Sequence, residues 1–139
     1  MVEDRIRCKA LLSKIMSSAD AAQLIHDGMV VGMSGFTRAG DAKAVPAALA
    51  ERAQREGQPL RITLVTGASL GHNTDKILTE AGVLARRLPF QVDSTLRRAI
   101  NNGEVMYVDQ HLSETVELLR TNRLGSRRCS SCATLDRYK

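Results

Sequence analysis

The sequence contains no tryptophan and only two phenylalanines and two tyrosines. A hydrophobic core must therefore consist mainly of Ala, Val, Leu, Ile and Met. Three cysteines, an odd number, do not suit a disulfide framework, so we expect a reducing, cytoplasmic setting. No apolar run approaches the roughly 18 residues of a membrane span, and the first residues lack the apolar segment of a secretory signal. These absences argue against a membrane-spanning or disulfide-stabilised protein.

The excess of positive charge is confined to the end of the chain. The formal net charge is +5, but residues 1–117 contain fourteen basic and fourteen acidic side chains. Residues 118–139 contain six basic side chains and one acid, Asp136. Because the body of the chain is balanced, its composition does not favour nucleic-acid binding.

Apolar segments and amphipathic segments alternate along the 139 residues, a length that suits one domain. Residues 29–33, 62–66 and 105–108 have the continuous apolar character of strands buried on both faces, and a weaker candidate strand precedes Pro89. This alternation predicts an α/β fold, an open, mostly parallel sheet with flanking helices. We expect the three clear strands to be parallel neighbours, with the helix at 46–56 packed on one face.

Capping residues mark the expected helix boundaries. Pro46 fits the first turn of the clearest helix, where its missing N–H is harmless. The expected N-caps are Ser17 or Ser18, Asn73 or Thr74, Asp93 or Ser94, and Ser113, and the expected stops are Gly28, Gly57, Gly103 and Gly125.

The stretch VVGMSGFTRAG, residues 30–40, is the most informative loop. Gly35 and Gly40 allow backbone N–H groups to approach a ligand closely, and the following helix directs its positive end to the same place. This suits a phosphate, a carboxylate or a thioester oxygen. The alternative is a tight turn that needs glycine for geometry alone. The stretch matches neither a dinucleotide-binding nor a P-loop motif.

The remaining candidates are weaker. Ser69, in the loop TGASLG, could offer a hydroxyl to a ligand. No cluster has metal-ligand spacing, and we assign no catalytic role to His72 or His111. The pair Cys129 and Cys132 has C-x-x-C spacing, but zinc would need two further ligands and none is near in sequence.

Four stretches in this order resemble the amino-terminal part of the acetyl-CoA hydrolase/transferase family. They are RIRCKALLSKIMSSADAAQLI, VVGMSGFTRAGDAKAVPAAL, LVTGASLG and LPFQVDSTLRRAINNGEVMYVDQHLS, within residues 5–125. The resemblance implies a CoA-transferase-like fold of two similar halves with the active site between them. This chain would be a truncated amino-terminal half-domain.

The resemblance implies that, in such enzymes, a glutamate attacks an acyl-CoA thioester and forms a glutamyl-CoA thioester. That glutamate belongs to the other half, so no catalytic residue is assigned here. The resemblance places Gly35, Phe36, Ala39, Gly40 and Ser69 at the substrate. It implies coenzyme A as a substrate, no further cofactor and no metal. Acyl-CoA and a small carboxylate are the expected partners, and the full-length enzyme is expected to be a homo-oligomer.

Two departures from the family stand out. Acetate-using members carry Asn-Thr after the Phe of the PF motif, whereas Gln91 and Val92 follow Phe90 here, which leaves room for a larger acyl group. After residue 125 the chain no longer resembles the family. We therefore expect a domain at 1–125 and a non-homologous, disordered tail at 126–139, without a strand or helix pattern. A shifted reading frame would explain that tail.

Three functions follow from these observations. The first is an amino-terminal fragment of an acyl-CoA hydrolase or CoA-transferase, inactive alone. The second is a non-catalytic module that binds CoA or an acyl group. The third, least supported, is a nucleic-acid-binding protein that uses its basic tail.

Overall fold

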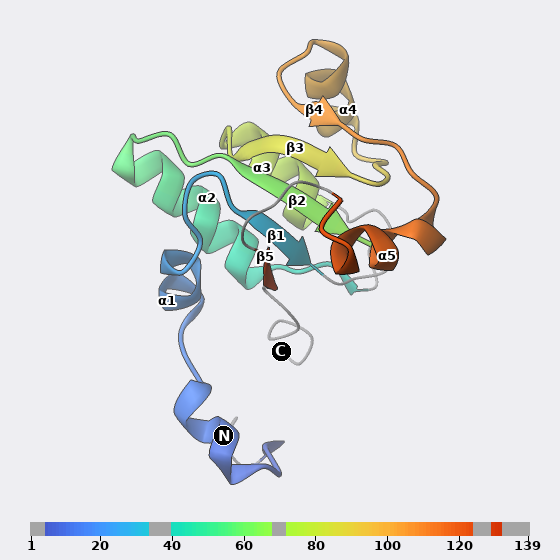
Figure 1. The fold of residues 1–139 in the computed structure, drawn as a ribbon. Coiled ribbons are helices and arrows are strands. Elements are labelled where there is room, and N and C mark those ends of the chain that lie inside the picture. The colour runs from blue at the N-terminus through green and yellow to red at the C-terminus, as the bar shows by residue number, and fades with distance from the viewer. Residues whose placement is uncertain (1–4, 34–39, 68–71, 124–128, 132–139) are drawn as a thin grey trace.

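The strands form one parallel sheet in the order β4-β3-β2-β1-β5 (Figure 1). The computed structural model describes residues 5–33, 40–67, 72–123 and 129–131. Within these residues the strands are β1 (Val30–Met33), β2 (Ile62–Thr66), β3 (Leu84–Leu88), β4 (Met106–Tyr107) and β5 (Cys129–Ser131). The α/β class predicted from the sequence, an open parallel sheet with flanking helices, is confirmed.

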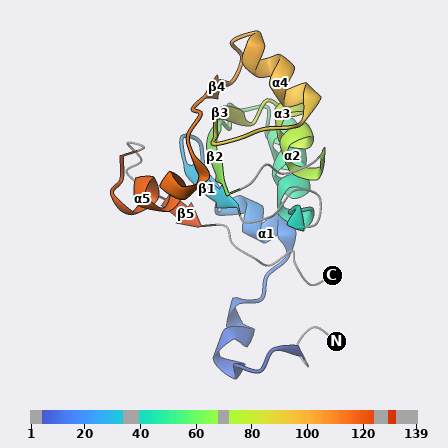
Figure 2. The same ribbon diagram turned by 90° about the vertical axis from the view of Figure 1, so that its right-hand side faces the viewer.

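Helices cover mainly one face of the sheet (Figure 2). On that face lie α1 (Ser18–Gln23), α2 (Ala44–Glu56) and α3 (Ile77–Glu80), whereas α5 (Thr115–Arg120) lies on the other. The remaining helical segments are α4 (Ser94–Asn101), the 3-10 turns Lys9–Lys14 and Leu112–Glu114, and the π-helical turn His72–Lys76. Among the described residues, no helix combines the length and apolar character needed to cross a membrane.

The principal core lies between the sheet and this helix layer. Ile62 and Leu64 of β2 contribute to it, together with Leu49 of α2 and Leu78 of α3. A smaller cluster of Val30, Val65 and Leu88, with Val108 packed against it, occupies the opposite face. Successive residues of β2 thus alternate between two buried faces, as expected for a central parallel strand.

Helix α2 follows the sequence prediction closely. Gly57, which ends it, has a φ of +60°, a left-handed conformation that favours glycine. Leu49 and Ala50 are buried against the sheet. From the same helix, Arg52 Nη1 donates to the carbonyl oxygens of Ala22 and Ile25, at 2.8 and 2.7 Å. These bonds add a charged donor to two carbonyl groups at the end of α1, of which that of Ala22 also accepts from the backbone N–H of Ile25.

Strand β3 contains a bulge that decides which of its arginines faces the helices. Leu84 is in register with Ile62 and Arg86 with Thr63, so Ala85 is an extra residue. After the bulge, Arg87 is in register with Leu64 and therefore points to the helix side. A regular strand starting from Leu84 would have placed Arg86 there.

Several sequence predictions need correction. The strand expected at 105–108 is only Met106–Tyr107, lies at the edge and leaves Met106 exposed. It does not adjoin β2, because the weaker candidate, β3, lies between them and is the better buried strand.

Capping was predicted with mixed success. Ser17 and Asp93 cap their helices through side-chain hydrogen bonds, as expected. Neither Asn73 nor Thr74 caps α3. His111 rather than Ser113 accepts the capping bond in the turn before α5. Gly28 has the expected positive φ, but α1 already ends at Gln23. Gly103 also has a positive φ. Gly125 lies outside the described residues.

The end of the chain contains an element that the sequence pattern did not predict. Residues Cys129–Ser131 form β5, which pairs in parallel with β1 from Val30 to Gly32. An α/β order calls for a strand at this point, and the structure places one there. The other residues of 126–139 lie outside the described part of the chain.

Candidate functional site

The carboxyl ends of all five strands point to one edge of the sheet, where ligands bind in open α/β folds. The sequence-predicted site residues belong to loops at this edge. Gly35, Phe36 and Ala39 fall within residues 34–39 and Ser69 within residues 68–71, outside the described residues. Gly40 is described and half-buried. The described residues around these loops define the candidate site.

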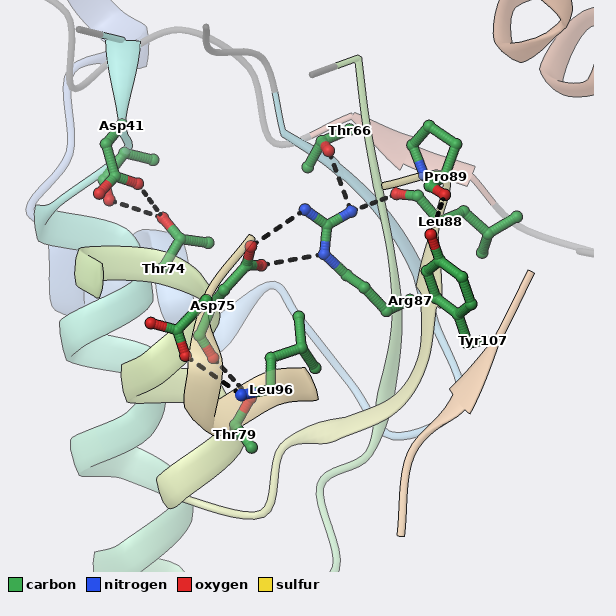
Figure 3. Close-up of polar contacts among 12 residues, drawn as sticks. Asp41, Thr66, Thr74, Asp75, Thr79, Arg87, Leu88, Pro89, Leu96 and Tyr107 are labelled. Carbon is green, nitrogen blue, oxygen red and sulfur yellow. Dashed lines mark hydrogen bonds and ion pairs between the residues drawn. The ribbon is translucent and has the colours of Figure 1, made fainter. Parts of the chain in front are cut away.

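Asp41, directly after Gly40, joins the start of α2 to the turn before α3 (Figure 3). The carboxylate of Asp41 accepts from the hydroxyl of Thr74 at 2.7 Å and from the backbone N–H of Asn73 at 3.2 Å. Asp41 is 7% exposed and Thr74 fully buried. This network fixes the end of the glycine-rich loop against the π-helical turn.

A buried ion pair lies next to it. Arg87 and Asp75 are both fully buried, and Arg87 Nε and Nη2 donate to the two carboxylate oxygens of Asp75 at 2.9 and 3.3 Å. Arg87 Nη1 donates to Thr66 Oγ1 at 2.9 Å and to the carbonyl oxygen of Leu88 (Figure 3). Burial raises the pKa of the Asp75 carboxyl above its ordinary value, and the Arg87 charge opposes that rise.

The loop after β3 has apolar side chains in solvent. It begins with a cis peptide between Leu88 and Pro89. Phe90 is 50% and Val92 52% exposed, whereas Asp93 is buried and accepts from the N–H groups of Thr95 and Leu96. The loop therefore exposes two apolar side chains at the carboxyl edge, while the hydrogen bonds of Asp93 hold its end in place.

Tyr107 of β4 contacts the same loop. Its hydroxyl donates to the carbonyl oxygen of Pro89 at 2.6 Å. Desolvation raises the pKa of the Tyr107 phenol, and the negative charge of Asp109 adds to the rise. Tyr107 is therefore a neutral hydrogen-bond donor at ordinary pH.

The other candidates from the sequence do not gather into a site. His111 caps a surface turn through Ser113, with 2.7 Å between Nδ1 and Oγ. The side chains of His72, Cys129 and Cys132 lie outside the described part of the structure. Among the described residues, no three His, Cys, Asp or Glu side chains are placed to hold a metal ion.

The anchoring residues have little signal in the sequence. Asp41, Asp75 and Arg87 were not predicted as site residues, and Thr74 was expected only as a possible helix cap, although each is buried. An arginine pair inside an apolar run was the one available hint. The bulge at Ala85 and the partner in a separate helical turn could not be read from spacing.

The chain belongs to the acetyl-CoA hydrolase/transferase family, because residues 1–128 match the N-terminal domain that defines it. Succinyl-CoA:acetate CoA-transferase from Clostridium kluyveri is 38% identical over 119 residues, which are 86% of this chain and 22% of that protein. Propanoyl-CoA:succinate CoA transferase from Escherichia coli is 40% identical over 113 residues, which are 79% of this chain and 23% of that protein. Acetyl-CoA hydrolase from Candida glabrata is 36% identical over 115 residues, which are 81% of this chain and 22% of that protein. The chain thus spans about a fifth of the length of these relatives.

Solved structures share the fold at lower identity. A variant of the decarboxylase AibA/AibB superposes with a TM-score of 0.56 at 24% identity, covering 80% of this chain and 44% of that one. RipA from Yersinia pestis superposes with a TM-score of 0.58 at 22% identity, covering 84% and 28%. These likenesses concern the fold.

Proposed function

We propose that this chain forms the amino-terminal part of an acyl-CoA hydrolase or CoA-transferase, in which its carboxyl-edge loops form one wall of the acyl-CoA site. The observation that carries the proposal is the family match over residues 1–128, which includes the segments that follow β1, β2, β3 and β4 at that edge. The relatives are named as CoA-transferases and acetyl-CoA hydrolases, so both reaction types use an acyl-CoA thioester.

The proposed chemistry is nucleophilic catalysis by a glutamate. The carboxylate attacks the thioester carbonyl and expels CoA thiolate, which leaves an acyl-glutamyl anhydride. The thiolate then attacks the glutamyl carbonyl, releases the acyl carboxylate and forms a glutamyl-CoA thioester. An acceptor carboxylate reverses these steps to receive CoA, or water hydrolyses the thioester.

The nucleophile is proposed to come from a part of the enzyme beyond these residues. The six glutamates that the structure describes are all exposed: Glu51, Glu56, Glu80, Glu104, Glu114 and Glu117. None of them sits in the sequence context of the family's catalytic glutamate, so we assign none of them to catalysis. This chain is proposed to supply backbone N–H groups of the glycine-rich loop, through Gly35 and Gly40, to the developing oxyanion. Ser69 would contact the substrate from the second loop, and Phe36 and Ala39 would contact it from the first.

The acyl group is proposed to meet an apolar surface. Phe90 and Val92 are half exposed at the carboxyl edge. Covering both against an acyl chain would favour groups larger than acetyl, by about 0.8 kcal/mol for each buried methylene.

A chimera tests the proposal. This chain replaces the matching amino-terminal segment of the Clostridium kluyveri transferase, and turnover of acetyl-, propionyl- and succinyl-CoA is measured with and without a carboxylate acceptor. We expect turnover by the chimera, and a glutamyl-CoA thioester on its carboxyl-terminal part by mass spectrometry. Gly35→Val in the chimera should impair turnover, because a side chain would block close backbone approach.

The chain alone is the matched control. We expect no turnover from it, and weak CoA binding, because one wall buries too little of the ligand to offset the cost of association. Tight CoA binding by the chain alone, with an inactive but folded chimera, would support a non-catalytic binding module instead. A glutamyl-CoA thioester trapped on the chain alone would place the nucleophile among its own glutamates.

A further inference from the structure

Arg87 lies where three segments of the carboxyl edge meet. It is the largest fully buried side chain among the described residues. The extra residue Ala85 shifts the alternation of β3, so that Arg87 rather than Arg86 points toward the helix layer. Bulges of this kind commonly redirect a side chain near a functional site.

The guanidinium group uses its fork to contact three different segments. Two of its nitrogens bind the carboxylate of Asp75, in the turn before α3. The third donates both to Thr66, the last residue of β2, and to the carbonyl of Leu88, the last residue of β3 (Figure 3). A lysine, a single point charge, cannot reproduce this planar arrangement.

Fold stability alone does not account for such a group. Taking two charges out of water costs more than their attraction commonly returns, so an apolar pair of similar volume often serves stability as well or better. An ion pair does supply directional hydrogen bonds that an apolar pair lacks. Here those bonds end at the last residues of β2 and β3, after which the edge loops begin.

The neighbouring residue extends this arrangement to the first loop. Thr74, directly before Asp75, binds the carboxylate of Asp41 next to Gly40. Two consecutive residues of one turn thus anchor the segments after β1, β2 and β3.

We propose that Arg87 is a positioning residue, which with Asp75 sets the placement of the loops after β2 and β3 relative to the turn before α3. Its importance for acyl-CoA binding rests on the proposed function above. Arg87 is too deeply buried to contact substrate and acts only through the loops that it holds.

The first test is amide hydrogen exchange on the 139-residue chain, which needs no ligand. The double variant Arg87→Met with Asp75→Leu removes both charges while keeping apolar volume. We expect its melting temperature to stay near that of the parent, while segments 64–67 and 87–96 exchange at least about tenfold faster. Exchange in α2 should stay unchanged and serves as an internal reference. Arg55→Met, at a largely exposed side chain of α2, is the control and should leave segments 64–67 and 87–96 unchanged.

Thr66→Val provides a second variant, which removes the hydroxyl that accepts from Arg87 with almost no change of shape. It should speed exchange in segment 64–67 more than in 87–96. Unchanged exchange in both segments, in the folded double variant or in Thr66→Val, would overturn the positioning role.

The second test separates this inference from the proposed function. In the chimera, the double variant should raise KM for acyl-CoA about tenfold or more, with a smaller effect on kcat. The reason is that the loops would no longer be held in the position that binds the substrate. Faster exchange with unchanged KM would leave Arg87 as a positioning residue and contradict the substrate wall. Unchanged exchange with raised KM would contradict the positioning role alone.

Discussion

Tyr107 donates its phenolic hydrogen to the carbonyl oxygen of Pro89, with 2.6 Å between the two oxygens. This bond ties the edge strand β4 to the loop that follows β3, directly after the cis peptide. Strand β4 pairs with β3 over two residues, and this bond adds a side-chain contact to that short pairing.

Tyr107→Phe should lower the free energy of unfolding by about 1 kcal/mol, because it removes one hydrogen bond and little apolar surface. Urea denaturation measures the change. In the parent, an ultraviolet titration should place the phenol pKa above its ordinary value of 10.0. Since the folded pKa is raised, stability should fall as pH rises from the unfolded value through the folded one. A phenol that titrates below 10.0 would contradict the structure.

Arg87→Met should lower the free energy of unfolding, and the loss should grow as pH rises. It leaves the Asp75 carboxylate buried without its cation, at a cost of about 3–5 kcal/mol near neutral pH. Removing the arginine also raises the pKa of Asp75 further from 3.8, because the opposing charge is lost. Above 3.8 the unfolded chain then releases a proton that the folded variant retains, so stability falls with increasing pH.

Denaturation curves between about pH 4 and 7 would measure this growing difference. Arg55→Met, at a largely exposed side chain, is the control and should change stability by about 0.5 kcal/mol or less. An Arg87→Met penalty that is constant over this range would mean that Asp75 does not titrate as described.

Arg52 and Arg55 provide a second matched pair, on α2. Arg52→Met should destabilise the fold by about 1.5–3 kcal/mol, because it removes charged hydrogen bonds to two carbonyls at the end of α1. Arg55 is largely exposed and makes only a 3.9 Å contact with Glu56, so Arg55→Met should have little effect. Thermal denaturation compares them, and equal losses would show that the carbonyl contacts contribute nothing.

Two truncations test the last strand. Removing residues 129–139 deletes β5 and leaves the edge of β1 unpaired, so we expect a melting temperature several degrees lower. Removing only 132–139 keeps β5 and should leave the melting temperature unchanged. If both truncations behave like the parent, the tail contributes nothing to the fold, as the sequence pattern alone had indicated.

The sequence predicted the elements whose signals are local. Helix α2 has Pro46 in its first turn and ends before Gly57, as predicted, although it begins at Ala44, ahead of the expected start. Asp93 also caps α4 as expected. Strand β3 was predicted only weakly, because Arg86 and Arg87 interrupt its apolar run. Strand β4 was predicted as a central strand, because an apolar run does not reveal whether a strand is central or at the edge.

The site was less accessible to prediction, because its anchors depend on long-range contacts. Asp41 and Thr74 are 33 positions apart, and Arg87 and Thr66 are 21 apart. Nothing in a spacing pattern indicates that such residues meet. The loops that the resemblance singled out, with Gly35, Phe36, Ala39 and Ser69, lie outside the described residues, so their contact with substrate stays a prediction.

Thr74 and Asp75 are adjacent in one short turn, yet they hold different loops. Because the two residues share one π-helical turn, we expect a displacement of either residue to be felt by the other. A ligand that shifts the segment around Asp41 would therefore change the free energy of the segments around Thr66 and Leu88 without touching them. Binding at the three loops would be energetically coupled, and the coupling would be reciprocal.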